Sequence, residues 1–137
     1  MSKYRTPRKF NIVSVFMLAI VAAGGYWMWV FFPVYWDAFT VDHLLREGAS
    51  ALYRLSQLKE PDRSAQMRAL LIKVKSDAVR LAHITDPDFD VSLDLDGDNV
   101  KMRCEYTVVV HHPIGAYTTV LQIKREEAAN VKKVQWD

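Results

Sequence analysis

The side chains with the clearest capacity for chemistry form an acidic run late in the chain, at Asp86, Asp88, Asp90, Asp94, Asp96 and Asp98. A calcium-binding EF-hand loop needs carboxylates at its first, third and fifth positions, Gly at the sixth and a bidentate Glu at the twelfth. With Gly97 at the sixth position, Ser92 stands first and Arg103 last, so the bidentate ligand is missing. We expect Asp94 and Asp96 to line the solvent face of a strand, with calcium binding as the alternative.

Histidines and one cysteine offer a second possible metal site, made of His83, Cys104, His111 and His112. Zinc sites usually show C-x-x-C or H-x-x-x-H spacing, and this sequence has neither among these residues. His111 and His112 are adjacent, so in an extended chain they point to opposite sides. We therefore predict no metal and no other cofactor.

Cys104 is the single cysteine, so it cannot form an internal disulfide. It falls on the apolar face of an expected strand, where a thiol is usually an inert core residue. The sequence contains no G-x-S-x-G, P-loop or G-x-G-x-x-G motif. We predict that the protein is not an enzyme.

An apolar stretch near the N-terminus runs from Ile12 to Phe32, 21 residues without a charge. As a helix it would be roughly 31 Å long, which matches a hydrocarbon core of about 30 Å. A cleavable signal peptide has an apolar region of only ~7–15 residues. Here the apolar run continues past the small residues Ala22, Ala23 and Gly24. We predict a retained transmembrane helix over 12–32.

Charge sets the expected orientation. The first eleven residues contain no acid and four basic residues, Lys3, Arg5, Arg8 and Lys9, while the rest has 14 basic and 16 acidic residues. The positive-inside rule then predicts a cytoplasmic tail at 1–11, a span in the inner membrane and a periplasmic domain at 33–137. Nucleic-acid binding usually needs a concentrated basic surface on the folded domain, so we do not expect it.

Two features of the span suggest partners beyond the lipid bilayer. Ala19, Ala22 and Ala23 lie on one helical side and would let another helix approach closely, with a chance cluster as the alternative. Seven aromatic residues follow, at Tyr26, Trp27, Trp29, Phe31, Phe32, Tyr35 and Trp36. Their stretch covers roughly 16 Å, deeper than an interfacial belt alone. We expect some rings to contact lipid tails, a bound pigment or quinone, or a neighbouring protein.

The remaining chain predicts an α+β domain. Pro33 marks an expected break or kink at the membrane exit. Periodicity changes from helical to alternating along the domain, which predicts helices over about 38–58 and 63–84 and strands over about 90–95, 100–110, 116–124 and 131–136. Two helices would then cover one face of an antiparallel sheet of three or four strands.

The stretch from Phe32 to Phe39, FPVYWDAF, directly follows the expected anchor. It resembles an uncharacterised family of short bacterial single-span membrane proteins with a small periplasmic pilin-like α+β domain. The resemblance implies the same order of elements and no catalytic residues. True pilins carry Gly before the processed Phe and a Glu five residues into the apolar run, whereas here Lys9 precedes Phe10 and Ser14 takes the Glu position.

These observations predict a non-enzymatic accessory subunit that stabilises or helps assemble a larger integral membrane complex, for example a respiratory or photosynthetic one. Its partners would be other integral membrane subunits and the bilayer. Two alternatives stay open. One is a pilin-like component of a pilus or secretion apparatus, and the other is a periplasmic binding module.

Overall fold

The computed structural model describes residues 11–55, 58–59, 61–96 and 99–130. Two helices and three strands follow one another as α1 (Ile12–Leu55), α2 (Asp62–Leu81), β1 (Asp90–Asp96), β2 (Asn99–His111) and β3 (Thr118–Asn130). The α+β class predicted from the sequence is confirmed. The basic tail with Lys3, Arg5, Arg8 and Lys9, and the expected strand at 131–136, lie outside the described residues.

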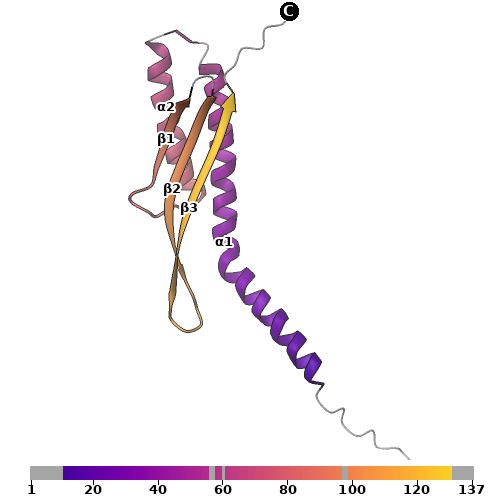
Figure 1. The fold of residues 1–137 in the computed structure, drawn as a ribbon. Coiled ribbons are helices and arrows are strands. Elements are labelled where there is room, and N and C mark those ends of the chain that lie inside the picture. The colour runs from indigo at the N-terminus through magenta and orange to yellow at the C-terminus, as the bar shows by residue number, and fades with distance from the viewer. Residues whose placement is uncertain (1–10, 56–57, 60, 97–98, 131–137) are drawn as a thin grey trace, which may run out of the picture.

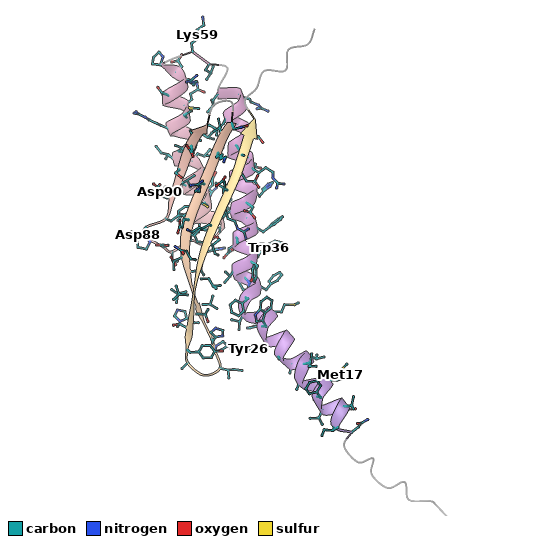
Figure 2. All side chains as sticks on the ribbon, viewed as in Figure 1. Met17, Tyr26, Trp36, Lys59, Asp88 and Asp90 are labelled. Atoms are coloured by element: carbon teal, nitrogen blue, oxygen red, sulfur yellow. The ribbon has the colours of Figure 1, made fainter. Side chains whose placement is uncertain are left out.

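Helix α1 is one element of 44 residues, so of the break or kink expected at Pro33 the structure excludes the break. The helix expected over 12–32 and the first part of the helix expected over 38–58, up to Leu55, belong to this single helix, while 56–57 lie outside the described residues. Proline removes one intrahelical hydrogen bond at a cost of about 3 kcal/mol, and it usually bends a helix rather than ending it when both sides are held. Here the downstream part is held because Val41, Leu45 and Leu52 are buried in the core. Figure 1 shows α1 bending, and in Figure 2 Met17 and Trp36 lie on its two arms.

The sheet has the order β1-β2-β3, with both pairs antiparallel. Its alternation was predicted from the sequence: Met102, Cys104 and Tyr106 are buried, while Arg103 and Glu105 between them are exposed. Strand β3 continues to residue 130 instead of 124, because it pairs with β2 along its full length, from 118 opposite 111 to 130 opposite 99.

Both helices cover the same face of the sheet (Figure 1), α1 behind β2 and β3 and α2 behind β1. The core forms where they meet, and Leu45, Leu52 and Met102 are among its fully buried side chains. Gly48 allows this close packing. A Cβ atom at Gly48 would lie 2.7 Å from Met102 Sδ and 3.1 Å from Val74 Cγ2.

Helix α2 ends at Leu81, three residues before the expected end at 84. His83 has a φ of 50°, in the left-handed region that an α-helix cannot contain. Ala82 closes the helix by donating its backbone N–H to the Ala78 carbonyl at 2.9 Å.

Candidate functional site

The β2–β3 hairpin is longer than the sheet that supports it. Strand β1 begins at Asp90, opposite Glu105, so from Tyr106 onwards β2 pairs only with β3. This two-stranded part extends beyond the rest of the domain and runs beside the first half of α1 (Figure 1). Its turn lies next to Tyr26, as Figure 2 shows. The hairpin thereby brings together residues that are far apart in the sequence.

His112 is the centre of this contact. Its ring is 7% exposed, and hydrogen bonds join its Nδ1 to Tyr26 Oη at 3.2 Å and its Nε2 to Thr119 Oγ1 at 2.8 Å. Tyr117 stacks on the imidazole with ring centroids 4.1 Å apart, and Phe31 meets it edge-on at 5.7 Å. Both ring nitrogens are therefore occupied by hydroxyl groups, which fixes the ring between helix and hairpin.

The turn that carries this histidine is closed by its own backbone. The His112 N–H donates to the Tyr117 carbonyl at 3.0 Å. Gly115 and Ala116 have φ values of 92° and 50°, so the chain reverses through two left-handed residues. The sequence predicted a turn here but not the role of His112. The missed signal is the alternation of β2, because the inward positions 102, 104, 106, 108 and 110 continue to 112.

The structure divides the seven aromatic residues into groups. Tyr26 and Phe31 face the hairpin, together with buried Val30. Trp27 and Tyr35 lie beside them, with ring centroids 6.0 Å apart.

The other three, Trp29, Phe32 and Trp36, are exposed on the side of α1 away from the sheet, as Figure 2 shows for Trp36. Phe39 continues this row, since its ring centroid lies 6.5 Å from that of Trp36. We call Trp29, Phe32, Trp36 and Phe39 the aromatic stripe; their spacing of three and four residues places them on one helix face. Phe39 was not among the expected site residues, although its position three residues after Trp36 was visible in the sequence.

The small residues Ala19, Ala22 and Ala23 are all exposed. Ala19 and Ala23 precede Tyr26 by seven and three residues, so they lie on the helix side that the hairpin covers further along. A second helix packed there would sit beyond the hairpin turn and apart from the aromatic stripe. Ala19 and Ala23 therefore lie on a different side of α1 from the aromatic stripe, whereas Ala22, seven residues before Trp29, lies on the same side as the stripe.

The described side chains of the acidic run do not converge on one point, and Asp98 and the side chain of Asp96 lie outside the described part. Asp86 accepts backbone N–H groups from Thr107 at 2.7 Å and Asp88 at 3.0 Å, which lowers the pKa of its carboxyl group. Asp90 pairs with Lys75 Nζ at 3.1 Å, and Asp94 is exposed. Within the described ranges, no group of three or more His, Cys, Asp or Glu side chains could hold a metal ion.

The other candidate residues are also separate. His83 Nδ1 lies 3.4 Å from Asp37 Oδ1, and His111 is exposed on the opposite side of β2 from His112, as the sequence indicated. Cys104 is buried, and burial, with a smaller contribution from Asp42, raises the pKa of its thiol to about 11. A thiol of that pKa is almost wholly protonated at neutral pH and is a poor nucleophile.

Comparison with known proteins adds no relative, since no family model, curated protein or solved structure matches this chain. The resemblance to short bacterial single-span proteins stays a prediction. By length and composition, α1 is the one helix in the described part of the chain that could cross a membrane.

Proposed function

We propose that the protein is a non-enzymatic, membrane-anchored accessory subunit that stabilises or helps assemble a larger integral membrane complex. The aromatic stripe of α1 is the observation that carries this proposal. It would bind the apolar surface of a neighbouring integral membrane subunit, just above and within the outer leaflet. The N-terminal tail would lie in the cytoplasm and the α+β domain in the periplasm.

Anchoring is supported by the first part of α1. Residues 11–25 are exposed all around the helix, with Ile12, Phe16 and Leu18 among the large apolar side chains that no other part of the described chain covers. Leaving such surface in water costs about 25 cal/mol per Å² of apolar area, so lipid or protein must cover it. The same helix continues into the domain core through Leu45 and Leu52, which favours a retained anchor over a cleaved signal peptide.

Docking is supported by the length and position of the aromatic stripe. From Trp29 to Phe39 it extends about 15 Å along the helix. The first charged residue of α1, Asp37, lies between Trp36 and Phe39, so the stripe continues past the point where charges return. Monomeric soluble proteins rarely expose contiguous apolar patches of this kind. Lipid would cover the end of the stripe at Trp29, and the end at Phe39 needs a protein partner.

Gentle detergent extraction from the native membrane, followed by native electrophoresis and identification of the co-migrating chains, tests this function. We expect co-migration with large integral membrane subunits in fixed stoichiometry, and loss of it in the variant Trp36→Ser/Phe39→Ser. Ile72→Ser is the matched control, because Ile72 on α2 is 69% exposed and Phe39 is 67% exposed. Migration as a monomer, or equal loss in the Ile72 variant, would contradict docking through the stripe.

A second candidate is a pilin-like component that self-assembles through α1. The continuous helix favours it, since residues 11–25 are left uncovered by the described part of the chain while the later part of α1 holds the sheet. The same experiment separates the two functions. A ladder of homo-oligomers without other subunits would support the pilin-like component.

A further inference from the structure

We propose that the tip of the β2–β3 hairpin is a second membrane contact, inserted into the interfacial layer of the leaflet on the domain side. The occupant of its exposed apolar surface would be lipid, at the boundary between headgroups and acyl chains. This inference rests on the proposed anchoring of α1, and it is independent of whether the aromatic stripe binds a partner.

The first support is the distribution of charge along the hairpin. From Tyr106 to Ile123 the chain contains no Asp, Glu, Lys or Arg, and we call this segment the uncharged half. The remainder, 99–105 and 124–130, is the charged half. Its outer face carries ion pairs, including Arg103 with Glu126 at 2.8 Å and Lys124 with Glu105 at 3.3 Å. The boundary between the halves is therefore sharp on both strands.

The second support is that the charge boundary of the hairpin matches that of α1. The helix is uncharged from Ile12 to Trp36, and the uncharged half lies against this part through the contact between His112 and Tyr26. The charged half instead reaches the later part of α1, where Arg125 Nη1 lies 3.5 Å from Asp42 Oδ2. Two separate contacts thus place the uncharged parts of the helix and the hairpin side by side. Both parts would then lie at the same depth in a membrane.

The third support is the surface that the uncharged half presents. Val109 and Val120 are paired across the strands and both are exposed. Ile114 and Tyr117 in the turn are also exposed, so apolar side chains return at the tip, beyond the outward pair His111 and Thr118. In the charged half the equivalent outward positions hold Arg103, Glu105 and Lys124, which makes the apolar surface specific to one end of the hairpin.

Geometry limits how deep the tip can lie. Tyr26 precedes Phe32, the end of the expected span, by six residues, or about 9 Å of helix. Amphipathic elements that bind at an interface typically bury their apolar face about 5–10 Å into the boundary between headgroups and acyl chains. Beyond Tyr106, towards the turn, the edge of β2 on the β1 side has no strand partner among the described residues, and unpaired backbone groups are not tolerated in the hydrocarbon core. The interfacial layer, where water and headgroups can pair with this edge, satisfies both limits.

Site-specific fluorescence on the full chain in lipid vesicles tests the insertion. The environment-sensitive dye NBD would be attached to a cysteine introduced at Ile114, at Ala128 on the outer face of the charged half, or at Val21 in the span. Cys104 is buried and protonated, so it stays unlabelled at neutral pH. The vesicles would contain phosphatidylethanolamine and phosphatidylglycerol, with a nitroxide-labelled lipid as quencher inside the membrane and iodide as quencher in water.

We expect the Ile114 label to lose emission to a nitroxide near the headgroup end of the acyl chain, and the Ala128 label to lose emission only to iodide. An Ile114 label that behaves like the Ala128 label, while the Val21 label is quenched by lipid, would overturn the insertion alone. A Val21 label quenched by iodide would overturn the anchor and the insertion together. Shielding of the Ile114 label only in the native complex, and not in pure lipid, would show that protein covers the tip and would also overturn the proposal.

A label at Ile114 replaces a side chain outside the core, since this residue is 68% exposed at the tip. A measurement without any label is nevertheless available. Amide exchange at 114–117 in the full chain should slow when vesicles replace micelles of a detergent with a small headgroup. Unchanged exchange would overturn the insertion independently of the dye.

Discussion

The two halves of the β2–β3 hairpin are held in different ways. The charged half has β1 as a third strand and both helices behind it, and its inward residues Met102 and Cys104 are fully buried. In the described part of the chain the uncharged half has no third strand. Its inward side meets α1 through His112 and Tyr26, and the segment between α2 and β1 through the ring contact of Tyr106 with Phe89. The outer face also differs, with ion pairs on the charged half and exposed Val109 and Val120 on the other.

This difference means that the charged half contributes to the stability of the whole domain, while the contacts of the uncharged half position the tip of the hairpin. A two-stranded hairpin is marginally stable in water, so the uncharged half depends on what it packs against. The charged half belongs to the common core and should open only when the whole domain unfolds. Changes in the charged half should therefore lower global stability, and changes in the uncharged half should release the tip alone.

The largest effect is expected for Met102→Ala. Met102 is fully buried between β2, α1 and α2, and truncation of such a side chain typically costs about 2–5 kcal/mol because it leaves a cavity. Chemical denaturation of the full chain in detergent micelles, followed by circular dichroism, would measure the loss. Val120→Ala is the control in the uncharged half, where an exposed substitution should change the free energy of unfolding by less than about 0.5 kcal/mol. Equal losses would contradict the division between the halves.

The next effect concerns how closely α1 approaches the charged half. Gly48→Leu should lower the free energy of unfolding by about 1–3 kcal/mol, since overpacking a tight core forces side chains and backbone apart. A Cβ at Gly48 would already lie 2.7 Å from Met102 Sδ. Gly25→Leu is the control, because a Cβ at Gly25 meets no atom within 4 Å. The same denaturation experiment compares them, and an unaffected Gly48 variant would show that the helix can move away from the sheet without loss.

A local effect is expected for His112→Ala. It removes two hydrogen bonds, each worth about 1 kcal/mol, together with the stacking on Tyr117. Amide exchange of 109–120 should become faster while that of 100–106 stays slow. His111→Ala is the control on the neighbouring exposed residue. Faster exchange along the whole of β2 would mean that the hairpin opens as one unit.

The charged half was predictable from the sequence, and the uncharged half was predictable only in part. Alternation along 100–110 gave the buried and exposed faces of β2, and helical periodicity gave the positions that α1 and α2 bury, such as Leu45 and Val74. Such patterns are local, and each residue reports on its own environment. The contact between His112 and Tyr26 joins two segments far apart in the chain, and no local pattern indicates which segments meet.

Pro33 shows the same limit for the helix. Its chemistry predicts the local loss of a hydrogen bond, but whether the helix ends or bends depends on what holds both sides. The core around Val41 and Leu45 decides this, and it forms only in the folded domain. The expected aromatic contact site stays a prediction, and which of its residues face the hairpin and which form the aromatic stripe required the structure.

A smaller effect is expected for Tyr106→Phe, at the boundary between the halves. The Tyr106 hydroxyl is buried without a hydrogen-bond partner in the described part of the chain, and burial raises its pKa to about 12. Removing a buried, unpaired hydroxyl should raise the free energy of unfolding by up to about 1 kcal/mol. Denaturation would measure the gain. A loss of stability would mean that a bound water or other group satisfies the hydroxyl.

The smallest effect is expected for Asp86→Ala, and its sign depends on pH. Asp86 accepts the Thr107 N–H next to the point where β1 begins, at Asp90 opposite Glu105, so its carboxylate takes the place of a strand partner at the start of the uncharged half. This hydrogen bond, followed by the one from Asp88, lowers the pKa below its ordinary value of 3.8. The ionised form is favoured in the folded state, so its contribution is complete above the unfolded pKa and is lost as the pH falls through the folded pKa. The melting temperature of Asp86→Ala should therefore lie slightly below that of the unchanged protein at neutral pH, and the gap should close as the pH falls below about 4. A gap of the same size at both ends of that range would mean that Asp86 acts through packing rather than through its charge.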